Sequence, residues 1–280
     1  ENAIVALQRL AAEHRARFEG VVVGITGSNG KTVVKEWTAR SLPAGVKLIA
    51  SPMSYNSQLG VALSLLMIEG DEQVALIEAG ISQRGEMARL EQMIRPDVVV
   101  VTSIGDAHQA NFESVEQKIE EKLQLARRAN RVVYHSSYPL LAKAVEALPV
   151  EAIDAAAEQG DEEHGEVQRI NSQLVKALCR AIGYDDVTLE KMEVAMRLEV
   201  KEGIEGSTII NDSYNSDINS LALALDTLSR VALGSKKVAV VSDILQSGMG
   251  DEELYSRVAA MVHHAEVDLF IGVGERISSY

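Results

Sequence analysis

Runs of apolar, mostly β-branched residues alternate with segments of helical periodicity over the first half of this chain. Strands that are apolar throughout, rather than at every second position, are typical of a parallel sheet covered by helices on both faces. The intervening segments, in which apolar residues recur every three or four positions, supply those helices. The pattern therefore predicts an α/β domain with a mostly parallel sheet. The expected strands are residues 20–27, 46–51, 73–80, 97–105 and 131–136.

The pattern changes in the second half of the chain. Residues 151–167 are acidic and rich in small residues, so we expect a solvated connection or helix ends there. Helical periodicity returns from 171 to 196, and residues 197–217 indicate two short strands around a turn. A helix, a strand, a helix and a strand follow. We therefore predict two domains: a central α/β domain, residues 1–197, and an incomplete Rossmann-like α/β domain, residues 198–280.

Composition narrows the possible functions. The chain has 280 residues, of which 46% are hydrophobic, and a formal charge of −14 at pH 7. Such a charge disfavours nucleic acid and anionic membranes as partners, because phosphate groups recruit basic surfaces. No apolar run approaches the roughly 20 residues that a membrane span needs. The lone Cys179 excludes an internal disulfide and a multi-cysteine metal site, which fits a reducing cytoplasm. Its apolar helical surroundings predict that it packs in the core.

The stretch "GITGSNGKT", residues 24–32, joins an expected strand to an expected helix. Its glycines allow tight turns that aim backbone N–H groups inward, and the following helix N-terminus attracts anions. Lys31 is placed to reach phosphates, and the Thr32 hydroxyl to bind Mg²⁺. A glycine-rich turn without a ligand is the alternative, but a run of small and polar residues that ends in Lys-Thr disfavours it. We therefore predict a P-loop, although its first glycine, Gly24, lies one position earlier than in the usual G-x-x-x-x-G-K-[ST] pattern.

Three further residues are candidates because they follow or flank expected strands. Glu78 ends a strand at the carboxyl edge of the sheet, where ligands bind in open α/β folds. His108 follows another strand, and Lys122 comes fourteen positions later. Each has an ordinary alternative: a helix-capping carboxylate, a solvated loop histidine and a surface lysine. Their common placement beside one phosphate loop favours a shared site.

The loop resembles that of the Mur ligase superfamily, which carries the same early glycine. Other segments are similar to this family in order along the chain: "SYNSQLG" from 54, "IEAG" from 77, the Ala-His pair at 107–108, "RLE" from 197 and "NDSYNSD" from 211. Ser57 and Ala62 depart from the family pattern. The resemblance implies that Thr32 and Glu78 bind one Mg²⁺, and that His108 and a carbamylated Lys122 bind a second. It implies that Lys31, Lys122 and His108 are catalytic. The nucleotide contacts it implies are Gly27, Ser28, Asn29, Gly30, Lys31, Thr32, Asn171, Arg197, Asp212, Tyr214 and Asn215.

The resemblance implies a cytoplasmic, ATP-dependent ligase of peptidoglycan precursor synthesis. Its substrates would be UDP-N-acetylmuramoyl-tripeptide and D-alanyl-D-alanine, joined through an acyl phosphate. Two alternatives stay open: a folylpolyglutamate synthase-like ligase, and a nucleotide-binding fragment with no activity of its own. A regulatory GTP-binding switch is a further rival, but the chain lacks the [NT]-K-x-D motif expected for guanine recognition.

The chain also differs from the family in extent. The UDP-sugar-binding domain that the resemblance implies at the N-terminus is missing, and the span from 134 to 171 is shorter than expected. The variants "YNSQ" and "SDILQSG" look like ligases that are fused to an alanine racemase. We therefore expect a fragment of a longer protein that makes no amide alone.

Overall fold

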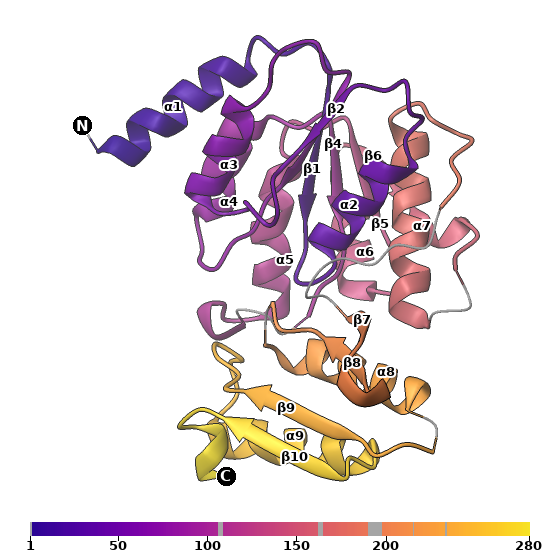
Figure 1. Ribbon diagram of the computed structural model, residues 1–280. Coiled ribbons are helices and arrows are strands. Elements are labelled where there is room, and N and C mark those ends of the chain that lie inside the picture. The colour runs from indigo at the N-terminus through magenta and orange to yellow at the C-terminus, as the bar shows by residue number, and fades with distance from the viewer. Residues whose placement is uncertain (1, 106–108, 162–164, 190–197, 215, 233) are drawn as a thin grey trace. The chain divides into compact units, whose positions relative to one another are not determined.

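The computed structural model describes residues 2–105, 109–161, 165–189, 198–214, 216–232 and 234–280. These residues form two compact units, each with its own elements (Figure 1). The first unit comprises the described residues up to 104 and from 112 to 189. The second comprises residues 105, 109–111 and the described residues from 198 onward.

The first unit is built on a six-stranded sheet in which every neighbouring pair of strands is parallel. The strand order is β2-β3-β1-β4-β5-β6, so the strand before the glycine-rich loop lies in the middle. The predicted parallel α/β sheet is therefore confirmed. The strands are β1 (Val21–Thr26), β2 (Leu48–Ala50), β3 (Val74–Glu78), β4 (Val98–Val101), β5 (Arg131–Tyr134) and β6 (Glu151–Asp154).

Helices cover both faces of this sheet (Figure 1). On one face, α3 and α4 pack against α1, and α4 and α6 pack against α5. The apolar residues of these five helices share a core with Val22, Ile77 and Val99 of the sheet. On the other face α2 contacts α7, which also contacts β4, β5 and β6. The central strands β1 and β4 are consequently buried from Val22 and from Val98 onward. The helices of this unit are α1 (Ala3–Arg15), α2 (Lys31–Ser41), α3 (Gln58–Leu66), α4 (Glu86–Ile94), α5 (Val115–Leu123), α6 (Pro139–Glu146) and α7 (Glu166–Ala181).

One expectation for this unit was wrong. The acidic stretch that begins at residue 151 was expected to be a solvated connection, but Glu151–Asp154 forms β6 at the edge of the sheet. An edge strand bonds to a single neighbour, here β5, and its outer side chains remain in water. Glu151 and Ala152 are exposed, so the strand lacks the apolar pattern that identified the others.

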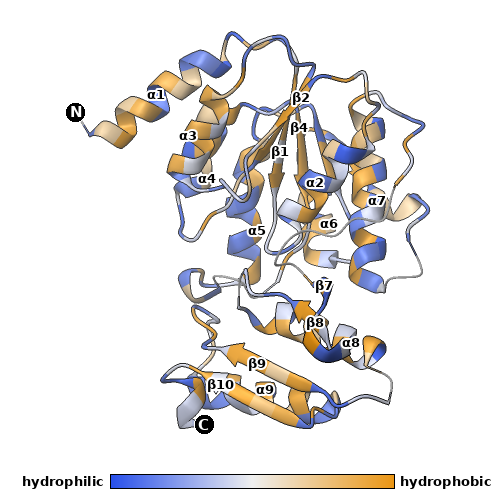
Figure 2. Cartoon of the chain, viewed as in Figure 1, coloured by the Kyte–Doolittle hydropathy of each residue, from blue (hydrophilic) through white to orange (hydrophobic). Residues whose placement is uncertain are grey.

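The second unit contains two small sheets. An antiparallel pair, β7 (Glu199–Glu202) and β8 (Thr208–Asn211), forms the expected two strands around a turn. A parallel pair, β9 (Val238–Ser242) and β10 (Leu269–Val273), is packed with α8 (Ile218–Val231) and α9 (Asp251–His264). Strands β9 and β10 are as hydrophobic as β1 and β4 (Figure 2). In the described part of the chain, every helix is too short or too polar to cross a membrane.

Candidate functional site

The loop between β1 and α2 requires glycine at two positions. Gly27 has φ +146°, and a Cβ atom there would lie 2.1 Å from Oγ1 of Thr102. Gly30 has φ +83° and caps α2 without a side-chain hydrogen bond to the helix N-terminus. Positive φ is open to glycine at little steric cost. Because Gly30 has no side chain with which to cap the N-terminal turn of α2, the amides of this turn and the helix dipole favour an anionic group there.

The end of strand β4 holds this loop in shape. Thr102 donates its hydroxyl hydrogen to the carbonyls of Asn29 and Thr26, and Ser103 Oγ lies 2.9 Å from the Asn29 carbonyl. The Ser28 amide donates to the Ser103 carbonyl at 2.9 Å. Sequence reasoning did not single out Thr102 or Ser103. The available signal was two hydroxyl residues directly after an apolar strand that neighbours β1.

Two lysines meet at the loop. Lys31 Nζ donates to the carbonyls of Gly27 and Ser28 at 2.9 and 2.8 Å, and Lys122 Nζ donates to the same Gly27 carbonyl at 3.0 Å. Lys122 comes from α5, whose apolar face carries it into the interior, so its side chain is buried. Burial, together with the charges of Lys31 and Lys118, holds the pKa of Lys122 well below its usual value. The structure therefore excludes the surface-lysine alternative and places Lys122 beside the loop.

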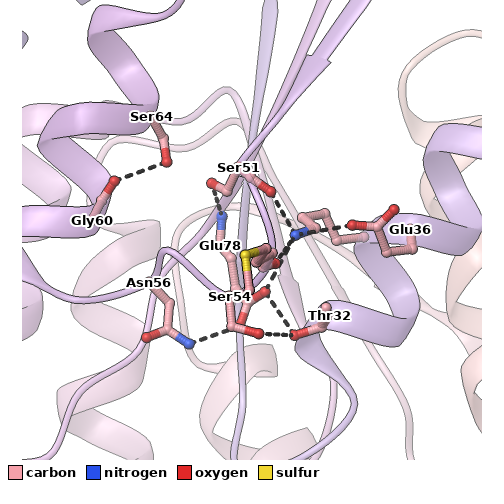
Figure 3. Close-up of polar contacts among 10 residues, drawn as sticks. Thr32, Glu36, Ser51, Ser54, Asn56, Gly60, Ser64 and Glu78 are labelled. Atoms are coloured by element: carbon pink, nitrogen blue, oxygen red, sulfur yellow. Dashed lines mark hydrogen bonds and ion pairs between the residues drawn. The ribbon is translucent and has the colours of Figure 1, made fainter. Parts of the chain in front are cut away.

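Glu78 lies at the carboxyl end of β3 and is fully buried. Its Oε2 accepts a hydrogen bond from Thr32 Oγ1 at 2.9 Å, and its Oε1 accepts one from Asn56 Nδ2 at 2.8 Å. Ser54 Oγ lies 3.0 Å from Thr32 Oγ1 (Figure 3). The carboxylate is thus held in place by a hydroxyl donor from helix α2 and an amide donor from the segment that follows β2.

Asn56 is a site residue that sequence reasoning missed. Besides its side-chain bond to Glu78, its carbonyl accepts a hydrogen bond from the Gly80 amide at 2.8 Å. A Cβ atom at Gly80 would lie 2.9 Å from Cγ of Asn56. The glycine of "IEAG" therefore leaves room for the residue that orients the glutamate. The available signal for Asn56 was its place in the segment "SYNSQLG", directly before Ser57.

The oxygen atoms of Glu78 and Thr32 are suitable ligands for a magnesium ion. Among the residues that the structure describes, no three His, Cys, Asp or Glu side chains come together as a metal site. Glu78 is joined instead by the hydroxyl of Thr32. Mg²⁺ keeps several water ligands and is typically bound by one or two carboxylates together with substrate phosphates. One carboxylate and one hydroxyl below a phosphate loop match that donor set.

The remaining predicted residues fall in different places. Asn171 on α7 is buried, and a Cβ atom at Gly30 would lie 3.0 Å from its Oδ1, so Asn171 borders the loop. In the second unit Asp212 Oδ1 accepts a hydrogen bond from the Leu198 amide at 3.1 Å, and Tyr214 is exposed. Three predicted residues lie outside the described part of the chain: His108, Arg197 and Asn215.

Comparison with known families agrees with this geometry. Residues 25–198 match the model of the Mur ligase middle domain. The chain belongs to the Mur ligase family. The resemblance expected from the loop is confirmed, and the sheet with its central loop strand is the fold of that domain.

Relatives in this family carry one recurrent name. The UDP-N-acetylmuramoyl-tripeptide–D-alanyl-D-alanine ligase of Bacillus subtilis is 24% identical over 307 positions, which cover 98% of this chain and 67% of the relative. That of Borreliella burgdorferi is 36% identical over 124 positions, which cover 44% of this chain and 27% of the relative. The chain spans about two thirds of the length of the relatives that it matches end to end.

Solved structures share the fold. The MurF ligase of Thermotoga maritima in complex with ADP has a TM-score of 0.82 and 23% identity, covering 98% of this chain and 75% of its own. A folylpolyglutamate synthase/dihydrofolate synthase with Mn, AMPPNP and L-glutamate bound has a TM-score of 0.68 and 15% identity. It covers 96% of this chain and 79% of its own.

Proposed function

We propose that this chain is the nucleotide-binding part of a cytoplasmic ligase that adds D-alanyl-D-alanine to UDP-N-acetylmuramoyl-tripeptide, with ATP and Mg²⁺ as cofactors. The observation that carries the proposal is the hydrogen bond between Thr32 and Glu78 beneath the loop of Gly27 and Gly30. It provides a carboxylate and a hydroxyl next to a helix N-terminus, in a chain of the Mur ligase family. The names of the matched relatives and the ADP complex of a structural neighbour support it.

Forming an amide from a carboxylate requires an activated acyl group. In the proposed reaction the terminal carboxylate of the tripeptide takes the γ-phosphoryl group of ATP, and the amine of D-alanyl-D-alanine then displaces phosphate. Two anions must approach each other in the first step, so positive charge has to be concentrated at the loop. Lys31, now bonded to the carbonyls of Gly27 and Ser28, would move its ammonium onto the phosphates.

Magnesium, when bound, would draw charge from the phosphate oxygens and bring the acyl carboxylate near them. Thr32 and Glu78 would hold one ion, and a second would lie near His108 and a carbamylated Lys122. A carbamate forms when neutral amine nitrogen attacks CO₂ and loses a proton. The buried, cation-flanked position of Lys122 favours the neutral amine, because desolvation and neighbouring positive charge both oppose the ammonium.

The other nucleotide contacts belong to the same proposal. The amides of Gly27, Ser28, Asn29 and Gly30 would face the phosphates, and Asn171 would border the adenine from α7. From the second unit, Asp212 would bind the ribose. Tyr214, Asn215 and Arg197 would complete the nucleotide contacts.

The rival within the family is a folylpolyglutamate synthase-like ligase, with which the chain shares a fold. The Asp-Ser-Tyr-Asn run at 212–215 favours the cell-wall ligase. The deciding test is incubation of the complete protein with ATP, Mg²⁺ and each substrate pair, followed by mass spectrometry. We expect the amide of D-alanyl-D-alanine with the UDP-tripeptide. Glutamate added to a folate, or no ATP-dependent amide with either pair, would contradict the proposal.

A further inference from the structure

Another buried cation, Lys35, lies one helical turn after Thr32 and has no part in the scheme above. Lys35 is fully buried on α2, and its Nζ donates to the Ser51 carbonyl at 2.6 Å and to the Met53 carbonyl. The same ammonium lies 3.8 Å from Oε2 of Glu78 and 3.2 Å from Oε1 of Glu36. Figure 3 shows Ser51, Glu36 and Glu78 around this point.

The burial of this ammonium demands a reason, because an unpaired buried charge is strongly unfavourable. Surface lysines normally keep their charged end in water. Here two carbonyls and two carboxylates surround Nζ, and one of those carboxylates, Glu78, is itself fully buried. Each charge therefore offsets the cost of burying the other. Removing either partner alone leaves a buried charge behind.

The two carbonyls that Lys35 binds belong to a segment that also shapes the site. Ser51 Oγ accepts a hydrogen bond from the Glu78 amide at 3.1 Å, and the segment continues to Ser54 and Asn56, which contact Thr32 and Glu78. Met53 has φ +49°, a left-handed conformation that is uncommon for a residue with a side chain. Its side chain is exposed, so its backbone carbonyl supplies the anchor.

We propose that Lys35 is a positioning residue of the metal–nucleotide site. Its ammonium ties the segment from Ser51 to Asn56 to helix α2 and compensates the charge of Glu78, so that the carboxylate is in place before the ion arrives. The part of this inference that concerns the metal rests on the proposed function. The coupling between Lys35 and Glu78 does not depend on that function.

The first arm of the test is a double-mutant cycle on the 280-residue chain without metal or nucleotide. Lys35→Met keeps the length of the side chain without its charge, and Glu78→Gln does the same for its partner. We expect each single variant to lower the melting temperature by several degrees, and the double variant to lose clearly less than their sum. Glu36→Gln, at a partly exposed partner, should change it little. Additive losses would overturn the proposal.

The second arm measures position with Mn²⁺ as a paramagnetic probe for Mg²⁺. Mn²⁺ is titrated in the presence of ATP by electron paramagnetic resonance, at a temperature well below the melting temperature of Lys35→Met. We expect Mn²⁺ to bind Lys35→Met on the order of tenfold more weakly than the wild-type chain. The matched control is Lys143→Met, on the exposed face of α6, with unchanged affinity. Unchanged or tighter binding in Lys35→Met would overturn the positioning role.

Two further outcomes are informative. If Lys35→Met fails to fold, recovery of folding in Lys35→Met/Glu78→Gln supports the proposal, and failure of both contradicts it. If the wild-type chain itself binds no Mn²⁺ with ATP, the proposed function fails, and the thermal cycle then decides whether Lys35 and Glu78 are coupled.

Discussion

Strands β4 and β9 are both rich in valine but have different surroundings. Both are parallel strands of mainly valine residues. In β4 every residue is buried, whereas in β9 buried and exposed positions alternate. Val99 is fully buried, and Val240 is 65% exposed. A run of valines therefore predicts that a strand forms but does not predict that both of its faces are covered.

The difference comes from the helices that accompany each sheet. In the first unit, helices pack on both faces of the six-stranded sheet. Among the described residues of the second unit, α8 and α9 supply the helical core contacts, with Leu225, Leu254 and Val258 buried against Ala239 and Val241. The outward positions of β10, including Leu269 and Val273, stay exposed. Burial is thus a property of the unit rather than of the strand.

The largest expected effect comes from placing a charge in each strand. Val99→Asp puts a carboxylate in the fully buried centre of β4, where it has no partner, and we expect a loss of about 4 kcal/mol or more in unfolding free energy. Val240→Asp should change that free energy by less than about 0.5 kcal/mol, because its side chain is already in water. Urea unfolding followed by circular dichroism measures both. Equal losses would contradict the burial difference.

Glycines with positive φ give the next comparison. Gly27 has φ +146° and Thr102 within 2.1 Å of a Cβ atom, whereas Gly234, in the second unit, has φ +76° and nothing within 4 Å. Gly234→Ala carries only the conformational cost, about 1 kcal/mol. Gly27→Ala adds a steric clash, so we expect a loss of about 2 kcal/mol or more and a distorted loop. Thermal unfolding and nucleotide titration of both variants test this. A milder effect at Gly27 would show that the loop relaxes freely.

Lysines provide a smaller, pH-dependent comparison. Because the pKa of Lys122 is lowered on folding, the folded state binds fewer protons, and stability rises with pH up to the ordinary lysine value of 10.5. Wild-type protein should therefore gain stability relative to Lys122→Met as the pH rises through the range below 10.5. The variant for comparison is Lys201→Met in the second unit, which removes a lysine whose side chain is 54% exposed. Melting temperatures across this range decide it, and parallel curves for wild type and Lys122→Met would refute the lowered pKa.

The sequence predicted the parts of the site that depend on local pattern. The loop and Thr32 are contiguous, and Glu78 ends an apolar strand, so both were accessible to motif and periodicity. Lys35, Asn56 and Thr102 act through contacts to residues far along the chain, and nothing local marks them as partners. Helical periodicity identified α5 but did not show that Lys122 lies inside.

The fold shows the same limit. Five strands of the first sheet were predicted from their apolar runs. Strand β6 was missed because an edge strand with exposed residues has no such run. The depth of each strand in the core depends on which helices pack against it, and that is settled by the whole unit.

The central claim is that the loop, Lys31, Thr32 and Glu78 form a site for ATP with magnesium. Isothermal titration calorimetry of the chain with ATP and with GTP, each with Mg²⁺, tests it most directly. We expect ATP to bind, GTP to bind far more weakly, and Lys31→Ala to lose most of the ATP affinity that depends on the phosphates. The matched control, Lys143→Ala on the exposed face of α6, should bind ATP as wild type does. GTP binding as tight as ATP binding, or ATP affinity unchanged in Lys31→Ala, would contradict the account.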